Sequence, residues 1–539
     1  MNSATVRLRG LAARLLRRHR RDRAIIAAEF DAAYYRGANP DVIASGFDPL
    51  DHFLAYGWRE GRDPTALFSV QDYLESNPDV AAAGVNPFVH YVEMGREEGR
   101  PTSHGLGFRY EAIRRLVPIE DQVAALARLE AAMPLGPASA LTAGLSRART
   151  GLRDLHITFS HDDYRTRVGG VQLCLQQEAA RLEALGRDHL HLSPPKSWPT
   201  LRPAGIAGRL EVLLNGQALG TYAPAVVAEA LAGACRGRPG ARSFAIHSLL
   251  GHDAAETADI VEAAGQRTGF YWLHDYASLC AGFNLLRNGV EDCGAPAPDS
   301  GACGICVFGE ARRAQHEAHE LLFRRLALTV VSPAAATLDF WRARTGLPAA
   351  ATLVHPHARL VERESAPVPP AGRPLRVAFL GHAAVHKGWP IFRDVALGHA
   401  EDPRYRFVHL GAAPEPGMPF EFHRVSVDAA RPRAMTEALE ALEADVVLFW
   451  PLWRETFSFA AHEAVAAGCA LVTGPDSGAV AALVTERGCG WVLPDEAALA
   501  EAFASGSIAA LSRTARKPML YDLPFSGMTA DLLRARAAA

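Results

Sequence analysis

The stretch that most restricts the fold of this chain runs from residue 445 to residue 494. It opens with an apolar run, Val446–Trp450, whose β-branched content and short length predict a strand buried on both faces. Pro451 ends that strand, and residues 456–467 carry apolar side chains at helical spacing. A second short apolar run follows at Ala470–Thr473. This order of strand, helix and strand predicts an α/β fold with a parallel sheet.

The same alternation extends over two larger parts of the chain. In the first part, strands are predicted at Leu155–Phe159, His189–Leu192, Leu210–Leu214, Phe244–His247, Gly269–Leu273 and Ala327–Val331. In the second part, Val377–Leu380 and Phe407–Leu410 precede the two strands described above. Right-handed crossovers place the carboxyl ends of such strands on one edge, where ligands bind.

These patterns predict two Rossmann-like domains. The first spans residues 151–360 and the second spans residues 375–510, with a Pro-rich polar linker at residues 361–374 between them. Residues 511–539 form a tail with a last helix.

Two glutamates stand near the start of the helix predicted for residues 456–467. Glu455 and Glu463 are eight positions apart, a little over two helical turns, so a helix that starts just after Glu455 aims both toward its N-terminal end. Free backbone amides at a helix N-terminus favour phosphate oxygens. Such a pair also occurs on solvated helix faces, but the setting between a buried strand, a proline and a small-residue strand favours a binding role.

This arrangement resembles the E-x7-E signature of glycosyltransferase family 4, the retaining enzymes with the GT-B fold. The resemblance covers about residues 152–503 and implies two Rossmann-like domains that face a cleft. It implies that Glu455 contacts hydroxyls of the donor sugar and that Glu463 contacts the ribose. Backbone amides of Phe457, Ser458 and Phe459 then bind the diphosphate.

A basic loop follows the first strand of the second domain. It contains Gly381 and His382, then His386, Lys387 and Gly388. A strand that ends in glycine, followed by a basic loop and a helix N-terminus, predicts an anion site. Family 4 enzymes have Gly-Arg and Lys-Gly here, and the arginine and the lysine both bind the diphosphate. His382 in place of the arginine weakens the neutralisation of phosphate charge at a pH where the histidine is neutral, unless another residue supplies the charge.

Two more candidate sites lie at strand ends in the first domain. Gly169 and Gly170 match the Gly-rich loop that family 4 enzymes place near the donor phosphates, where glycine allows close backbone approach. His274 and Asp275 end a buried strand and resemble the family's His-Asp or His-Glu pair, whose histidine contacts the transferred sugar. His247 is a weaker candidate of the same kind.

Four of the eight cysteines fall within one Gly-rich segment that interrupts the α/β pattern: Cys280, Cys293, Cys303 and Cys306. Four thiolates suit a structural Zn²⁺, and an Fe–S cluster is the alternative metal group. His316 or His319 can replace one cysteine as a ligand. Without a metal, these are buried thiols or a disulfide formed on oxidation.

An internal repeat precedes the first domain. Phe30 matches Phe68, 38 positions later, and the segment Asn-Pro-Asp-Val recurs at the same spacing, which predicts two helical repeats over residues 24–104, each of two short helices. Similar repeats are appended to bacterial polysaccharide glycosyltransferases. His52 and His90 recur at matching positions, either as packed side chains or as metal ligands. A helical connector is predicted at residues 105–150.

Composition restricts the partners. The 539-residue chain has a formal net charge of −3, which gives no indication of nucleic-acid binding. Residues 1–23 form a basic N-terminal segment, either a frayed end or an amphipathic helix on an anionic membrane surface. This start does not read as a secretion signal, so the cysteines indicate a reducing compartment. We therefore expect a cytoplasmic protein, with the alternative of peripheral contact with the inner membrane.

The sequence as a whole predicts a retaining transferase that moves a hexose-type sugar from a UDP- or GDP-sugar to a glycan, lipid-linked or other acceptor. The expected pathway is bacterial polysaccharide or cell-envelope synthesis. His274, Glu455 and Lys387 are the expected catalytic residues, and the resemblance implies no need for a catalytic metal. The alternatives are a sugar-nucleotide epimerase of the same fold and a non-catalytic scaffold that acts through the repeats.

Overall fold

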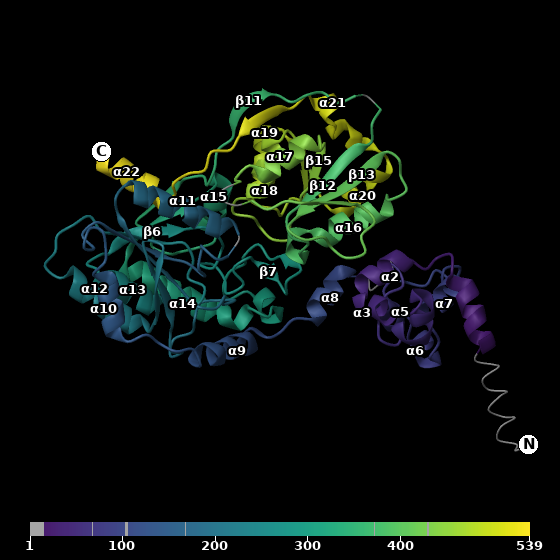
Figure 1. Cartoon of the computed structure of the whole chain (residues 1–539), viewed down its shortest axis with the longest axis horizontal. Helices are drawn as coiled ribbons and strands as arrows, with labels where there is room; N and C mark the ends of the chain where they lie inside the picture. Colours follow the sequence, from purple (N-terminus) through teal and green to yellow (C-terminus); the bar gives the residue numbers. More distant parts are fainter. Residues whose placement is uncertain are drawn as a thin grey trace, which may run out of the picture.

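The computed structural model describes residues 16–66, 68–102, 106–167, 169–370, 372–427 and 431–538. Figure 1 shows a helical module at the N-terminal end of the described chain, followed by two α/β domains. The first fifteen residues of the predicted basic segment lie outside the described residues.

The N-terminal module contains two copies of one unit, and each copy has three short helices rather than the two predicted. The first copy has α2 (Ala32–Ala38), α3 (Pro40–Ser45) and α4 (Pro49–His52), and the second has α5 (Val70–Ser76), α6 (Pro78–Ala83) and α7 (Pro87–His90). A π-helical turn ends each copy, at Phe53–Gly57 and at Tyr91–Gly95. The prolines explain the difference, because each one starts a new helix and cannot continue the preceding one.

The repeated histidines pack against repeated tyrosines. The hydroxyl of Tyr35 lies 3.0 Å from Nδ1 of His52, and the hydroxyl of Tyr73 lies 2.8 Å from Nδ1 of His90. The glycine five positions after each histidine leaves room for that tyrosine, since a Cβ there would lie 2.0 or 2.2 Å from the hydroxyl oxygen. The recurrence of these residue types therefore reflects packing within each unit.

The N-terminal α/β domain is built on an eight-stranded sheet with the order β10-β9-β6-β5-β1-β2-β3-β4. Its strands are β1 (Leu155–Phe159), β2 (Asp188–Ser193), β3 (Leu210–Leu214), β4 (Gln217–Tyr222), β5 (Ser243–Ile246), β6 (Thr268–Trp272), β9 (Ala327–Ser332) and β10 (Ala351–Val354). The surrounding helices are α10 (Ala138–Leu145), α11 (Gly170–Ala184), α12 (Pro224–Cys235), α13 (Ala254–Ala263), α14 (Gly309–Arg325) and α15 (Ala335–Arg342).

The sheet is parallel as predicted from β10 to β2, and its edge beyond β2 is antiparallel. Strands β2, β3 and β4 pair antiparallel. Asn215 and Gly216 form the two-residue turn between β3 and β4, with φ values of 51° and 77°. An Asn-Gly pair suits a tight hairpin because both residues tolerate positive φ.

The C-terminal α/β domain has a fully parallel six-stranded sheet with the order β14-β13-β12-β15-β16-β17. Its strands are β12 (Leu375–Leu380), β13 (Tyr405–Gly411), β14 (Glu421–Arg424), β15 (Val446–Leu448), β16 (Ala470–Thr473) and β17 (Gly490–Val492). Its helices are α16 (Trp389–Gly398), α17 (Ala434–Ala441), α18 (Phe459–Ala466), α19 (Ala479–Arg487), α20 (Glu496–Ala504) and α21 (Arg513–Arg516), with 3₁₀ turns η4 (Val385–Lys387) and η5 (Ser507–Leu511).

Two chain crossings join the α/β domains. The predicted linker is only partly irregular, because its first five residues form β11 (Val361–Ser365), which pairs antiparallel with β18 (Met519–Asp522). The tail then returns to the N-terminal domain as α22 (Thr529–Ala538), the yellow helix beside α11 in Figure 1. Nε1 of Trp272 donates to Oγ1 of Thr529 at 2.9 Å, which fastens α22 beneath β6.

The connector between the module and the first domain contacts both domains. Its helix α8 (Phe108–Arg114) carries Arg109, which pairs with Glu496 of the C-terminal domain. Its helix α9 (Ile119–Ala131) is followed by α10, whose Leu141 and Leu145 belong to the core of the N-terminal domain.

The carboxyl ends of the two sheets face one cleft. The fold is thus the predicted one: mixed α/β with two Rossmann-like domains facing each other, as in the GT-B fold, behind a small all-α module. Among the described residues, no helix combines the length and the hydrophobicity needed to cross a bilayer.

Asp445 provides a test of this architecture. Its buried carboxylate pairs with Arg373 at 2.8 and 3.0 Å and accepts from the backbone amides of Arg376 and Arg513, each at 2.9 Å. We expect Asp445→Ala to lower the free energy of unfolding by about 3–5 kcal/mol in urea titrations, because it removes a buried carboxylate that pairs with Arg373 and accepts from two backbone amides. Asp495→Ala removes only the N-cap of α20 and should cost about 1 kcal/mol. Equal losses in the two variants would contradict this assignment.

Candidate functional site

A cavity of about 570 Å³ lies in the cleft between the two α/β domains. The N-terminal domain contributes several lining residues: His161, Gly170, Gln172, Trp198, His274, Asp275 and His357. The C-terminal domain contributes the others discussed below: Gly381, His382, Lys387, Trp453, Arg454, Glu455, Phe457, Ser458 and Phe459. Most of the residues singled out from the sequence therefore meet in one space. Gly169, His247, Glu463 and the four clustered cysteines do not line it.

Lys387 and Glu455 form an ion pair at the centre of the C-terminal wall. Nζ of Lys387 lies 2.8 Å from Oε1 of Glu455, and Nε1 of Trp453 donates to the same oxygen at 2.7 Å. The ammonium also lies 4.4 Å from the centre of the Trp453 ring, a cation–π distance. The indole thus holds both charged groups in place within the cavity.

The helix after Glu455 begins later than predicted, which changes how this residue is placed. Helix α18 starts at Phe459 instead of residue 456, because the hydroxyl of Ser458 accepts from the amide of Ala461 at 3.2 Å and caps the helix. Glu455 is extended and forms a parallel bridge with Gly478. Its side chain is therefore positioned by a strand contact and not by the first turn of a helix.

Thr456 explains why the helix cannot begin earlier. Its hydroxyl donates to the carbonyl oxygen of His274 at 2.9 Å, and its own carbonyl accepts from the hydroxyl of Thr337 at 2.8 Å. Both partners belong to the N-terminal domain. These bonds hold residue 456 against the opposite domain and outside the helix.

Glu463 lies inside α18 and is 6% exposed. Its carboxylate has no hydrogen-bond partner among the described residues, and burial raises the pKa of this group to about 7. The ribose-binding role of Glu463 stays a prediction.

The predicted phosphate loop has two glycines with backbone conformations that other residues rarely adopt. Gly381 has φ of +93°, and Gly388 has φ of +82°. A Cβ at Gly388 would lie 1.9 Å from the carbonyl oxygen of Trp450, so this position requires glycine. Between them, burial and the neighbouring Lys387 lower the pKa of His386 to about 4, which keeps this imidazole neutral. His382 lines the cavity.

Arg454 is a second cation at the cavity that sequence reasoning missed. One of its terminal nitrogens lies 2.6 Å from Oδ2 of Asp292, a residue of the short strand β8 (Glu291–Asp292). The guanidinium also lies 4.5 Å from the centre of the Phe340 ring. Asp292 belongs to the short pair that β8 forms with β7 (Leu286–Arg287), so the Cys-rich insertion contributes to the electrostatics of the cleft.

His274 ends a chain of hydrogen-bonding groups that runs into the core. Its Nε2 lies 2.9 Å from Nδ1 of His247, and Nε2 of His247 lies 3.0 Å from Oε2 of Glu178. Burial and three neighbouring histidines, His357, His247 and His161, hold the pKa of His274 well below its usual range. Burial raises the pKa of Glu178, but the contact with His247 lowers it by more. The pKa of Glu178 therefore lies below its usual value. His274 is thus a neutral imidazole with a fixed inner partner.

The predicted glycine pair stands at the N-terminus of α11, across the cavity from α18. A Cβ at Gly170 would come within 3.5 Å of the Phe459 ring. Gly169 has extended backbone, and a Cβ there would lie 2.3 Å from Oε1 of Gln172. Gln172 in turn donates to the carboxylate of Asp162 at 2.8 Å. Gly169 thus leaves room for the Gln172 side chain of its own domain, whereas a Cβ at Gly170 would make only an ordinary van der Waals contact with Phe459 of the other domain.

The four clustered cysteines are free thiols. Burial raises the pKa of Cys280 to about 12, and Sγ of Cys303 accepts from Nη1 of Arg312 at 2.9 Å. Within the described chain, they do not supply three ligand atoms that lie within 4.8 Å of one another. His319 is buried and lies 3.1 Å from the hydroxyl of Tyr271. The structural zinc at Cys280, Cys293, Cys303 and Cys306 stays a prediction.

Comparisons with known proteins give distant structural similarity only. No protein-family model matches the chain, and no curated protein matches it. Solved structures that resemble it include a GtfA/B complex (8% identity, TM-score 0.42, covering 71% of this chain and 98% of that one). HepE of Anabaena in complex with UDP and glucose gives 14% identity, a TM-score of 0.40 and coverages of 71% and 98%. A UDP-forming α,α-trehalose-phosphate synthase from Burkholderia vietnamiensis is 13% identical with a TM-score of 0.37, and the match covers 71% of this chain and 94% of that one.

The buried carboxyl of Glu463 predicts a pH-dependent stability. Its pKa rises from 4.5 to about 7 on folding, so the folded state binds the proton more tightly. This contribution is present below pH 4.5 and is lost as pH rises through 7, by about 3 kcal/mol in total. In urea titrations from pH 5 to pH 8, the unfolding free energy of Glu463→Gln should fall less than that of the unchanged chain. Glu501→Gln, an exposed change on α20, should retain the full slope; identical slopes in all three proteins would contradict the prediction.

Proposed function

We propose that this chain is a retaining glycosyltransferase that moves a hexose-type sugar from a UDP- or GDP-sugar to an acceptor hydroxyl. One observation carries the proposal: the Lys387–Glu455 pair of the C-terminal domain and His274 of the N-terminal domain line the same cavity. A cation, a carboxylate and a neutral imidazole around one space suit the binding of a sugar diphosphate.

The donor diphosphate is proposed to lie against the C-terminal wall. The ammonium of Lys387 and the free amides at the start of α18, from Phe457 to Phe459, would stabilise the negative charge that develops on the departing phosphate. In this structure the charge of Lys387 is balanced by Glu455. A bound diphosphate would share the ammonium, while Trp453 keeps the carboxylate in position to accept from sugar hydroxyls.

The transferred sugar is proposed to lie between Glu455 and His274. The neutral imidazole of His274 has its Nε2 engaged by His247, so its other ring nitrogen is the one available to a sugar hydroxyl. In a retaining reaction of this type, the acceptor hydroxyl enters on the face that the diphosphate leaves. Its bond to the sugar carbon forms as the carbon–phosphate-oxygen bond breaks, and its proton passes to the departing phosphate oxygen. Positioning and charge stabilisation supply the rate enhancement.

The acceptor is proposed to be a glycan or a lipid-linked sugar of bacterial polysaccharide or cell-envelope synthesis. This part rests on the resemblance of the N-terminal repeats to those of polysaccharide glycosyltransferases. Contact of the basic N-terminal segment with the inner membrane belongs to the same proposal.

An epimerase of the same architecture is the second candidate. Burial raises the pKa of Asp275 to about 6, and this carboxyl lines the cavity beside His274. A carboxyl that titrates near neutral pH suits acid–base chemistry on a bound sugar. Release of free nucleoside diphosphate that depends on an acceptor supports transfer, and a new sugar isomer without an acceptor supports epimerisation.

Lys387 gives the decisive variant. We expect Lys387→Ala to lower kcat/KM for transfer by about 100-fold to 1,000-fold, because the leaving diphosphate loses its cation. Lys387→Arg should recover part of this loss. Lys517→Gln, an exposed change in the C-terminal domain, should leave the rate unchanged. Full activity of Lys387→Ala in a nucleotide-release assay would place the diphosphate elsewhere.

His382 gives a second test, which concerns the missing arginine. His382→Arg introduces a cation that stays charged at alkaline pH. The ratio of its kcat/KM to that of the unchanged chain should therefore rise between pH 7 and pH 9. A ratio that does not change with pH would mean that residue 382 does not face the phosphates.

A further inference from the structure

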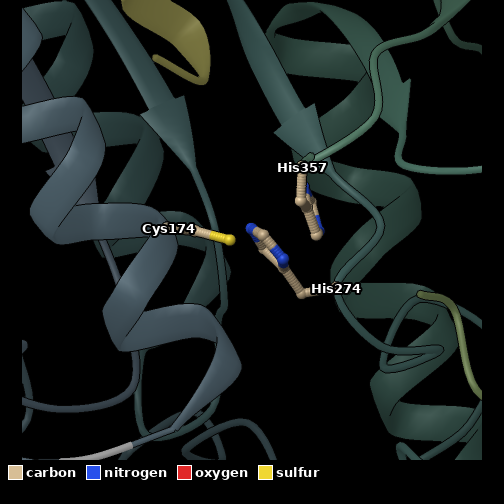
Figure 2. A group of neighbouring side chains, drawn as sticks. All are labelled: Cys174, His274 and His357. Atoms are coloured by element: carbon tan, nitrogen blue, oxygen red, sulfur yellow. The ribbon is translucent and has the colours of Figure 1, made fainter. Parts of the chain in front are cut away.

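Three side chains from separate elements converge at the N-terminal side of the cleft. Cys174 lies on α11, His274 follows β6, and His357 follows β10. Their ligand atoms all lie within 4.8 Å of one another, and this is the one such group of three or more in the described part of the chain. Figure 2 shows the imidazole of His274 between the thiol of Cys174 and the imidazole of His357. We propose that these three residues bind a zinc ion.

Cys174 and His357, the two ligands on either side of His274, are buried and have few hydrogen-bond partners that would compete with a metal ion. Cys174 is 2% exposed and His357 is 4% exposed. Nδ1 of His357 has no hydrogen-bond partner in the described part of the chain, an uncommon state for a buried ring nitrogen. A metal ion would satisfy it.

The geometry requires a small adjustment. Zinc bonds of about 2.1 Å to nitrogen and 2.3 Å to sulfur place neighbouring ligand atoms roughly 3.5 Å apart. The rings of His274 and His357 are stacked, with centres 4.8 Å apart and planes at 29°. Rotation of His357 about its side-chain bonds therefore has to turn a ring nitrogen toward the point that Cys174 and His274 share. His357 lies in a loop between β10 and β11, and its ring packs against that of Phe457 with the two planes tilted at 59°.

His274 already has the outer partner that metal-binding histidines commonly have. His247 contacts its Nε2 at 2.9 Å, and Glu178 contacts His247 at 3.0 Å. Such second partners orient the ring and increase its basicity toward a metal on the other nitrogen. Glu178 is itself fixed by the backbone amide of Thr529, at 2.9 Å, so the tail helix α22 supports the site.

The ligand chemistry selects the metal. One thiolate and two imidazoles suit zinc, whereas magnesium and calcium require oxygen ligands, which this group lacks. Three protein ligands leave one position of a tetrahedral ion open. His274 and His357 line the cavity, so that position faces the space proposed for the sugar.

Occupancy by zinc has a consequence that rests on the proposed function. An ion bound to His274 removes the ring nitrogen proposed to contact the transferred sugar. Zinc should therefore inhibit transfer, and a chelator should restore it. Binding itself is measured without turnover, so failure of the proposed activity and failure of the metal site are distinguishable.

The experiment uses the full chain, purified with a chelator and then titrated with Zn²⁺ and, separately, with Co²⁺. We expect one tightly bound Zn²⁺ per chain at this site and a cobalt spectrum with a thiolate charge-transfer band. Cys174→Ser should abolish that band, and both Cys174→Ser and His357→Asn should weaken zinc binding at least 100-fold. Cys235→Ser removes a buried thiol on α12 and should change neither the cobalt band nor the zinc affinity.

Two further results would overturn the proposal. The first is a thiolate–cobalt band that survives Cys174→Ser but is lost in Cys303→Ser, since the metal would then belong to the Cys-rich segment. The second is the absence of any thiolate–cobalt band in the unchanged chain, which decides the question even where a variant fails to fold. Circular dichroism of each variant establishes that it is folded before its affinity is compared.

Discussion

The candidate site depends on contacts that hold the two α/β domains against each other. On the cleft side, the hydroxyl of Thr456 bonds to the carbonyl of His274 at 2.9 Å. On the far side, Thr529 of α22 bonds to Trp272 and Glu178, each at 2.9 Å. Trp272 and His274 are separated by one residue at the end of β6, so both contacts fix the same strand end. Because of this, residues more than a hundred positions apart are held in one cavity.

The same contacts explain the electrostatics of the cleft. Lys387 and Arg454, the lysine and the arginine on the described cavity wall, are each paired with a carboxylate, Glu455 and Asp292. The histidines on the opposite wall are neutral because they are buried near one another. These cations are therefore already balanced by carboxylates, and a diphosphate would have to bind by sharing them and the backbone amides at the start of α18.

Burial of histidines is a recurrent feature of the N-terminal domain. His156, His189 and His252 lie in or beside its sheet, and burial lowers the pKa of each to between about 3 and about 4. Uncharged imidazoles can pack in a core while keeping hydrogen bonds to neighbours such as Thr158 and Ser243. The Glu178–His247–His274 chain extends this pattern to the cavity, where the imidazole becomes accessible to a ligand.

Ten of the fourteen strands in the two sheets could be predicted from the sequence to within two residues at each end, because short apolar runs between turn residues leave few alternatives. The four strands β4, β10, β14 and β17 were not predicted, and their residues are less buried than those of the central strands. The sequence also placed Gly381, Lys387 and Glu455 at strand ends, where parallel sheets expose their loops. The late start of α18 at Phe459 was decided by tertiary structure, since it depends on the bond between Thr456 and His274, two residues distant in sequence. The hairpin of β3 and β4 has a local signal, the Asn215-Gly216 turn, but its antiparallel pairing with β2 depends on the tertiary structure. Cys174, His357 and Arg454 carry no local signal. The tertiary structure brings His357 and Arg454 to the cavity and places Cys174 beside His274 and His357.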